Sequence, residues 1–254
     1  MSPALKRFFT SQILKSGTAS VVLSQEESHH LRNVFRLATG ERCLILDSAG
    51  HEWEGKIAFS DESKLARITL LKPIQNSFVQ HYRLIIAQAI PQRGKMDLIV
   101  EKAAELGIDL LIPMITERTM VRMKQEAQQK VLGRWEKIIQ AAQKQSHSRI
   151  STQVRGCQSF DQVLRDASDS KFSFLLHPSA QNTLPEVLNG LKLKISAEST
   201  GSIYVLIGPE GGFSPDEYEQ AIKKGLAPVC LGGNILKTDT AFVAIASAFQ
   251  FALL

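Results

Sequence analysis

The chain has 254 residues, of which 44% are hydrophobic and 22% charged, a balance that excludes disorder as the main state. No apolar run reaches 18 residues and the N-terminus lacks the apolar core of a secretory signal, so we expect neither a membrane-spanning helix nor secretion. The three cysteines, Cys43, Cys157 and Cys230, are far apart in the chain. They predict no disulfide and no metal site, and they favour a reducing, cytoplasmic setting.

The net charge of +5 is distributed unevenly along the chain. Residues 78–157 carry 13 basic and 7 acidic side chains, whereas residues 158–254 carry 7 and 10. A concentrated positive field attracts polyanions such as nucleic acids. Charge alone is equally compatible with a solvated helix face that has no such partner.

Residues 1–75 show short β-rich runs separated by turn residues, a pattern that predicts a small barrel. A short helix capped by Ser24, with Glu27 three residues later, interrupts them. We expect Pro73–Ser77 to link this region to the rest of the chain. The expected strands are Ser20–Leu23, Arg42–Asp47, Glu52–Ser60 and Leu65–Leu71.

From residue 82 onward, strand-like and helix-like segments alternate, which predicts an α/β fold with a mostly parallel sheet covered on both faces. The expected strands are Tyr82–Ala89, Asp109–Ile115, Lys171–Leu176, Ser202–Ile207 and Pro228–Leu231. The expected helices are Lys95–Leu106, Ala127–Gln145, Ser159–Ala167, Thr183–Leu191, Ser214–Lys224 and Thr240–Leu254.

A glycine-rich turn, Ile207-Gly-Pro-Glu-Gly-Gly-Phe213, follows one expected strand and precedes a helix that Ser214 caps and Glu217 supports as its third residue. Its glycines allow a ligand to approach the backbone closely, and ligands bind at the carboxyl ends of strands in α/β sheets. No dinucleotide or P-loop pattern is present, and the Glu210 carboxylate would repel phosphate. The turn therefore indicates a cationic or amine-bearing ligand, although a tight turn without a ligand is also compatible.

Two further segments follow expected strands in the same way. In Leu231–Ala241, Gly232 and Gly233 predict a turn, and Thr238 or Thr240 could cap the last helix. Lys237 lies beside that helix start, where the helix dipole disfavours a cation, so both plain solvent exposure and a chemical task remain open. In the segment that ends Leu176-His-Pro178, a lone histidine is more often a hydrogen-bonded turn residue than a catalyst.

Seven motifs, including the two glycine-rich segments, occur in a characteristic order and spacing. They are Lys6–Phe9, His29–Val34, Lys95–Ile99, Lys102–Gly107, Arg134–Lys137, Ile207–Phe213 and Leu231–Ala241. Together they resemble the RsmE-type 16S ribosomal RNA (uracil-N3)-methyltransferases of the SPOUT class, over nearly the whole chain. The resemblance implies an N-terminal PUA-like β-barrel over residues 1–75 that binds RNA. It also implies a C-terminal SPOUT α/β domain over residues 78–254 with a deep trefoil knot, a homodimer, S-adenosylmethionine (SAM) as cofactor and no metal.

The resemblance also implies site residues, most of them in the three loops described above. For SAM these are Leu176, His177, Pro178, Ile207, Gly208, Pro209, Glu210, Gly211, Gly212, Leu231, Gly232, Gly233, Asn234, Ile235, Leu236, Thr238, Thr240 and Ala241. Catalytic candidates are Lys237, as a donor to the uracil carbonyl oxygens, and Glu210, as a proton acceptor. A role for Glu210 in neutralising the ligand or bracing the turn stays open. From their charge, candidates for RNA phosphate contacts are Arg7, Arg32, Arg36, Arg93, Lys95 and Arg149, each equally compatible with a solvated surface charge.

The chain departs from the family where members usually have two arginines, at the positions of Asn234 and Lys237. Lysine keeps the charge but loses the planar fork of arginine, and asparagine loses the charge. The expected reaction is in-line attack of uracil N3 on the SAM methyl group, in 16S ribosomal RNA of the small subunit. Alternatives are a SPOUT enzyme acting on another RNA base or site, a non-catalytic RNA-binding protein, and a nucleotide-dependent enzyme of another class.

Overall fold

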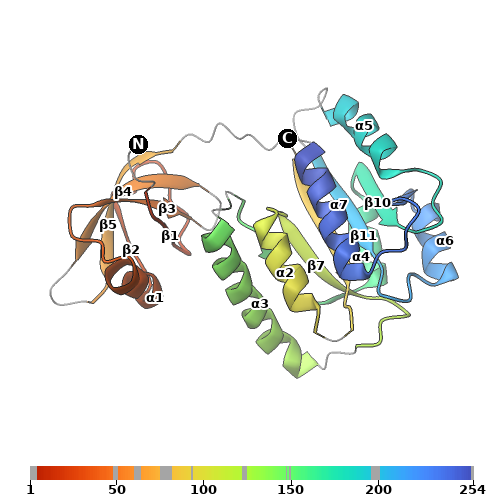
Figure 1. Ribbon diagram of the computed structural model, residues 1–254, viewed down its shortest axis with the longest axis horizontal. Coiled ribbons are helices and arrows are strands. Elements are labelled where there is room, and N and C mark those ends of the chain that lie inside the picture. Colours follow the sequence, from red (N-terminus) through yellow and green to blue (C-terminus); the bar gives the residue numbers. More distant parts are fainter. Residues whose placement is uncertain are drawn as a thin grey trace. The chain divides into compact units, whose positions relative to one another are not determined.

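The computed structural model describes residues 5–47, 51–59, 64–74, 82–92, 94–121, 125–146, 148, 150–195 and 201–252. The chain forms two compact units. One comprises Met1–Val79 with Gln143–Ser151, and the other comprises Gln80–Ala142 with Thr152–Leu254. Both units are drawn in Figure 1.

The first unit contains a five-stranded sheet in the order β1-β3-β4-β5-β2. Its strands are β1 (Arg7–Phe9), β2 (Ser20–Val22), β3 (Arg42–Leu46), β4 (Glu52–Phe59) and β5 (Ala66–Pro73). The last four were predicted from the sequence, whereas β1 was missed because three residues are too few to show a strand period. β1 pairs in parallel with β3, whereas the other neighbours in this sheet are antiparallel.

The interpretation of Pro73–Ser77 as a linker is wrong at its first residue. Pro73 is the last residue of β5 and pairs with Trp53, and the Ile74 N–H donates to the Glu52 carbonyl oxygen at 2.8 Å. Proline fits here because it ends the strand, where its missing N–H costs no ladder hydrogen bond. The remaining linker residues, 75–77, lie outside the described residues.

A short helix, α1 (Gln25–His29), runs directly into a π-helical turn, η1 (His30–Val34). The Ser24 hydroxyl caps α1 as predicted, accepting from the Glu27 N–H at 3.2 Å. The Glu27 side chain does not complete a capping box, because its carboxylate accepts from the Phe9 N–H at 3.1 Å. The core that this turn covers consists of Phe8, Leu14, Val21, Leu23, Leu31, Cys43, Ile45, Trp53, Ile57, Ala66 and Ile68.

The second unit is built on a parallel sheet in the order β12-β10-β11-β6-β7-β8, with β9 also pairing with β7. β12 ends before Cys230 and Leu231, which had been predicted as strand, because Cys230 makes only an isolated bridge to Thr183. The strands are β6 (Tyr82–Ala89), β7 (Leu110–Ile115), β8 (Gln153–Val154), β9 (Gln158–Ser159), β10 (Phe172–Leu176), β11 (Gly201–Ile207) and β12 (Ala227–Val229).

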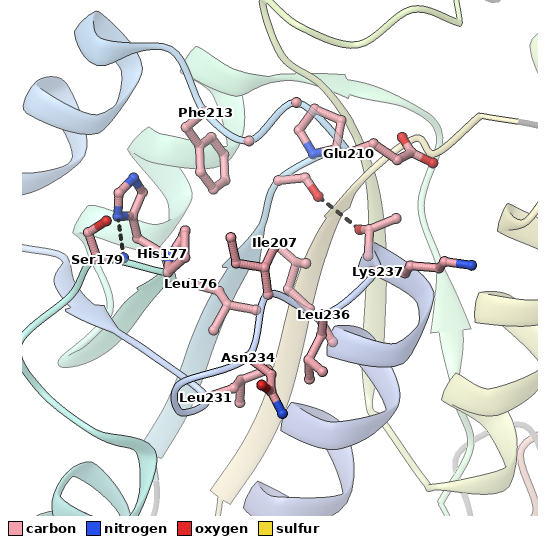
Figure 2. A pocket seen from close by; sticks show the side chains of 18 of the residues that line it. Leu176, His177, Ser179, Ile207, Glu210, Phe213, Leu231, Asn234, Leu236 and Lys237 are labelled. Atoms are coloured by element: carbon pink, nitrogen blue, oxygen red, sulfur yellow. Dashed lines mark hydrogen bonds between the residues drawn. The ribbon is translucent and has the colours of Figure 1, made fainter.

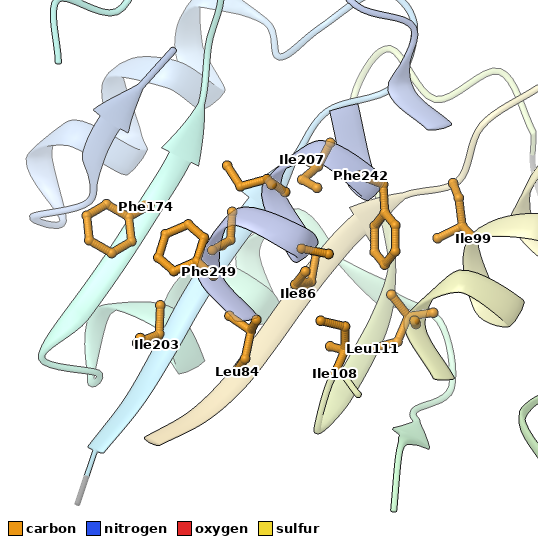
Figure 3. Packing of buried hydrophobic residues seen from close by; sticks show 14 of the residues in the cluster. Leu84, Ile86, Ile99, Ile108, Leu111, Phe174, Ile203, Ile207, Phe242 and Phe249 are labelled. Carbon is orange, nitrogen blue, oxygen red and sulfur yellow. The ribbon is translucent and has the colours of Figure 1, made fainter. Parts of the chain in front are cut away.

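Helices cover both faces of this sheet, as the alternation of strands and helices predicted. Apolar side chains of α2, α3, α5 and α7 pack on one face, and those of α4 and α6 pack on the other. Figure 3 shows part of the first face, where Phe242 and Phe249 of α7 lie beside Leu84 and Ile86 of β6. α7 begins two residues before the predicted start. The helices are α2 (Met96–Glu105), α3 (Gln125–Ser146), α4 (Phe160–Ser168), α5 (Leu184–Ile195), α6 (Pro215–Lys223) and α7 (Thr238–Ala252).

Because the strands of the second unit are parallel, the segments that follow β10, β11 and β12 all leave the same edge of the sheet. This edge holds the three segments that the sequence analysis singled out. Within the described residues, no helix is both long enough and apolar enough to cross a membrane.

Candidate active site

A cavity of about 600 Å³ lies at the carboxyl ends of β10, β11 and β12, beside the start of α7 (Figure 2). This volume is typical of small-molecule sites. All the residues predicted to hold SAM line it except Gly233 and Thr240, and Lys237 lines it as well. Three further lining residues, Arg118, Ser179 and Phe213, were not among the predicted site residues.

The Gly208–Phe213 loop after β11 is held by hydrogen bonds from several elements. The Gly212 N–H donates to the Pro209 carbonyl oxygen at 2.9 Å, and the Arg118 guanidinium donates to the Gly211 carbonyl oxygen at 2.9 Å. The turn is also tightly packed, because a Cβ added at Gly208 would lie 3.3 Å from the Gly212 backbone. Gly212 itself has a φ of +68°, which favours glycine. The loop therefore has a defined shape before any ligand binds.

The start of α7 is joined to this loop through a buried polar relay. Gln88 is fully buried near the end of β6. Its Nε2 donates to the carbonyl oxygen of the next residue, Ala89, at 2.8 Å and to the Thr238 hydroxyl at 2.9 Å. The Thr238 hydroxyl in turn donates to the Gly208 carbonyl oxygen at 2.9 Å. The Ala89 carbonyl fixes the amide orientation, since the flipped amide would place two acceptor oxygens together.

This relay corrects the expectation that Thr238 or Thr240 caps the last helix. Thr238 is the first helical residue, and its hydroxyl bonds to another segment of the chain instead of to a free N–H of its own helix. The result is a connection between β6, the loop after β11 and the start of α7.

The segment Leu231–Lys237, between β12 and α7, is mostly exposed. Ile235 has 88% of its surface accessible, an unusual position for a large apolar side chain next to a cavity. Gly232 has a φ of +132°, a backbone conformation that L side chains rarely adopt. Leu231 packs against the core of the unit, and the exposed residues after it add an apolar surface to the cavity.

The cavity has an apolar part and a charged part. In Figure 2, Leu176, Leu231 and Leu236 lie together, while the side chains of Glu210 and Lys237 extend toward the side away from His177. The Glu210 carboxylate accepts from the Gln92 N–H at 3.1 and 3.3 Å. The charged part thus lies where the segment after β6 meets the loop after β11.

An ion pair lies near the start of α7. Lys95 Nζ donates to Asp239 Oδ1 at 2.8 Å. This hydrogen bond is the main reason that the pKa of Asp239 is lowered from its ordinary value, and the charges of Lys95 and Lys237 act in the same direction. Lys95 had been predicted to contact RNA phosphate, but here its charge is matched by a carboxylate.

His177 lies at the other end of the cavity. Its Nδ1 accepts from the Ser179 N–H at 3.3 Å, and its ring centroid is 4.6 Å from that of Tyr218. Partial burial lowers the pKa of His177, which favours the neutral imidazole. These contacts are those of a hydrogen-bonded turn residue at the cavity wall.

The other residues predicted to contact RNA lie in varied settings. Arg7, on β1, is largely buried and forms an ion pair with Glu52 at 2.6 Å. The Arg32 guanidinium lies over the Phe59 ring, 4.2 Å from its centroid. Arg36 is exposed and has a φ of +54°. Arg93 and Arg149 lie outside the described residues.

The described residues contain no group of three or more His, Cys, Asp or Glu side chains that could hold a metal ion. The cavity instead offers backbone groups of glycine turns, an apolar wall and a few polar side chains. Such a set suits an organic ligand with an apolar ring system and a polar end.

The fold and the cavity correspond to a class of RNA-modifying enzyme. The family model for an RNA methyltransferase domain matches residues 79–250, and the model for an RNA methyltransferase PUA domain matches residues 23–69. The second unit is therefore a methyltransferase domain of this class, and the first unit contains its PUA domain.

Individual relatives narrow the class. The ribosomal RNA small subunit methyltransferase E of Synechocystis is 30% identical to this chain, and the match covers 88% of this chain and 70% of the relative. The ribosomal RNA small subunit methyltransferase E of Bacillus subtilis is 26% identical, and the match covers 97% of this chain and 96% of the relative. The chain belongs to the ribosomal RNA small subunit methyltransferase E family. The resemblance inferred from the motifs is thereby confirmed.

Solved structures agree with this assignment. The ribosomal RNA small subunit methyltransferase E from Neisseria gonorrhoeae, bound to S-adenosyl methionine, has a TM-score of 0.81 at 25% identity, with 98% of each chain covered. A Legionella pneumophila structure in complex with SAM has a TM-score of 0.80 at 26% identity, again with 98% of each chain covered.

Proposed function

We propose that this protein uses SAM to methylate the N3 atom of a uridine in 16S ribosomal RNA of the small subunit. The observation that carries the proposal is the convergence of three strand-end segments, after β10, β11 and β12, on one cavity of about 600 Å³. Family membership gives the class of reaction, and relatives named as small subunit methyltransferases point to the RNA.

The residues of the cavity fit SAM. Leu176, Ile207, Leu231 and Leu236 offer apolar surface for an adenine ring, and the glycine turns offer backbone groups for its polar atoms. When bound, SAM supplies a methyl group that its sulfonium makes electrophilic. The protein's part is then to hold the uracil in line with that methyl group and to manage one proton and one developing charge.

Lys237 is the candidate for the developing charge. As uracil N3 loses its proton, negative charge spreads onto O2 and O4, which a nearby ammonium group stabilises. Among the described residues Lys237 has no ion-pair partner and lines the cavity, so its ammonium group is available to a substrate. Glu210 is the candidate proton acceptor, held in place by the Gln92 N–H.

The finer features of the architecture belong to the same proposal. We infer that the five-stranded sheet closes into a PUA-like barrel over residues 1–75 and that residues 78–254 form a knotted SPOUT domain. The connection of α7 back to β6 and β11 through Thr238 is compatible with such a chain path. A homodimer would cover Val243 and Phe251, which are exposed on α7. Sedimentation equilibrium tests the homodimer, and we expect the enzyme to act in the cytoplasm.

The decisive experiment uses small ribosomal subunits from a strain that lacks the endogenous enzyme. After incubation with the protein and SAM, the RNA is digested and its nucleosides are identified by mass spectrometry. We expect 3-methyluridine. A different methylated nucleoside would overturn the N3 specificity, and the absence of both methylation and SAM binding would instead support a non-catalytic RNA-binding protein.

A further inference from the structure

Arg118 is an exposed cation at the cavity. It lies in the turn after β7 and lines the cavity together with the Gly208–Phe213 loop. Its guanidinium donates one hydrogen bond, from Nη1 to the Gly211 carbonyl oxygen, at 2.9 Å. Within the described part of the chain it makes no ion pair with a carboxylate. Its positive charge is therefore not compensated by a carboxylate there, and further N–H donors remain for a ligand.

The turn that carries Arg118 is rigidly built. The Thr116 N–H donates to the Thr119 hydroxyl at 2.9 Å, the two buried threonine hydroxyls bond to each other at 2.9 Å, and the Thr119 N–H donates to the Thr116 carbonyl oxygen at 3.1 Å. A four-residue turn closed by three such bonds holds the backbone of Arg118 in one conformation.

A buried carboxylate joins this turn to the cavity loop. Glu217 accepts from the Glu117 N–H at 2.8 Å and from the Ser214 N–H at 2.9 Å. The same carboxylate thus completes the capping box of α6 and fixes the residue next to Arg118. Preorganisation of this kind reduces the entropy lost when a side chain binds a ligand.

The charge distribution favours RNA as the source of the ligand anion. Arg118 begins a basic stretch of the sequence that also contains Arg122, Lys124, Lys130, Arg134 and Lys137 against only two glutamates, Glu126 and Glu136. This stretch belongs to residues 78–157, the most positive third of the chain, which suits a polyanion such as RNA. The cavity residues that fit the adenine ring of SAM are apolar. A guanidinium matches a phosphate group with two parallel hydrogen bonds.

We propose that Arg118 binds an RNA phosphate next to the target nucleotide and so positions that nucleotide at the cavity. The inference rests on the proposed function. The ligand chemistry is an anionic oxygen, and the carboxylate of SAM is the other possible source in this reaction. If the anion is an RNA phosphate, the removal of Arg118 weakens RNA binding. If the anion is the SAM carboxylate, the removal of Arg118 weakens SAM binding.

The test compares Arg118→Ala and Arg118→Lys with Arg165→Ala, which removes an exposed arginine from α4 outside the cavity. Equilibrium titrations measure SAM affinity and, separately, the affinity of the SAM-bound protein for small-subunit RNA at several salt concentrations. For Arg118→Ala we expect RNA affinity to fall about tenfold, as for the loss of one charge-assisted hydrogen bond. SAM affinity should change much less, because the exposed Gly211 carbonyl oxygen that loses its partner can be hydrated instead. The slope of log RNA affinity against log salt concentration should become shallower by the amount expected for roughly one phosphate contact.

Arg118→Lys should recover part of the RNA affinity, because it keeps the charge and loses the fork. The control Arg165→Ala should match the unaltered protein in both titrations. Weaker SAM binding with unchanged RNA binding would overturn the inference in favour of the cofactor carboxylate, and unchanged affinity for both would overturn it outright. Failure of the proposed function would be visible separately, as the absence of 3-methyluridine with the unaltered protein.

Discussion

The two segments that form most of the cavity differ in how the protein holds them. The Gly208–Phe213 loop receives hydrogen bonds from Gln92, Arg118 and Thr238, on three other segments. The Leu231–Lys237 segment is mostly exposed, and its apolar Ile235 faces solvent. We propose a division of roles from this difference, in which the first loop supplies a fixed shape and the second supplies the candidate catalytic cation, Lys237, and a cover for the ligand.

The largest expected effect comes from removing the cation of the exposed segment. Lys237→Ala should lower kcat by roughly 100- to 1000-fold, the usual consequence of losing one donor to a developing oxyanion, about 2.7–4 kcal/mol. SAM affinity should stay within a factor of about two, because in the proposed mechanism Lys237 contacts the uracil and not the cofactor. Methyl-transfer kinetics and an equilibrium SAM titration measure the two quantities. Near-normal turnover would remove Lys237 from the mechanism and the division of roles with it.

The next largest effect should come from breaking the buried hydrogen bonds that join Gln88, Thr238 and Gly208 and hold the first loop. Thr238→Val keeps the shape of the side chain but leaves the Gly208 carbonyl and one Gln88 N–H without a partner. Each unsatisfied buried group costs about 1–3 kcal/mol. We therefore expect SAM affinity to fall roughly tenfold and Tm to fall by several degrees. Thr238→Ser, which restores the hydroxyl, should recover both values, and equal SAM binding by the valine variant would show that the relay does not shape the site.

A smaller effect should follow from shortening the apolar surface of the exposed segment. Ile235→Ser should weaken SAM binding by roughly fivefold, part of the 1.5–3 kcal/mol that burial of a large apolar side chain contributes. Ile222→Ser is the matched control, because Ile222 is a half-exposed isoleucine on α6 that does not line the cavity. If both variants bind SAM equally well, Ile235 does not cover the ligand.

The smallest effect concerns the ion pair between Lys95 and Asp239. Since the pKa of Asp239 is lowered in the folded state, its contribution to stability is present above the ordinary aspartate pKa and is lost as the pH falls through the folded-state value. For a partly exposed pair this amounts to about 0.2–1 kcal/mol. Urea unfolding at several pH values should show Asp239→Asn less stable than the unaltered protein at neutral pH and equal to it in strong acid. An equal difference at all pH values would assign the effect to something other than this carboxylate.

Much of the fold could be read from the sequence because its signals are local. Strand β6 was predicted with the observed bounds, and Ser159 and Ser214 were placed at helix starts, where they form capping boxes. The glycine-rich turns that line the cavity could be recognised for the same reason, because glycine allows local backbone conformations that other residues rarely adopt. Very short strands such as β1 and β8 were missed, because pairing with distant strands stabilises them and no local pattern does.

The sequence by itself determined the class of fold, the family and the three segments that would meet at one edge of a parallel sheet. Only the tertiary structure decided how the polar side chains there are used. It pairs Lys95 with Asp239, commits the Thr238 hydroxyl to Gly208, and brings Arg118 to the cavity through Gly211 and Glu217. These outcomes depend on contacts between residues 30 to 144 positions apart. Periodicity and spacing report only on a residue's own helix, strand or turn, so no local pattern could have revealed them.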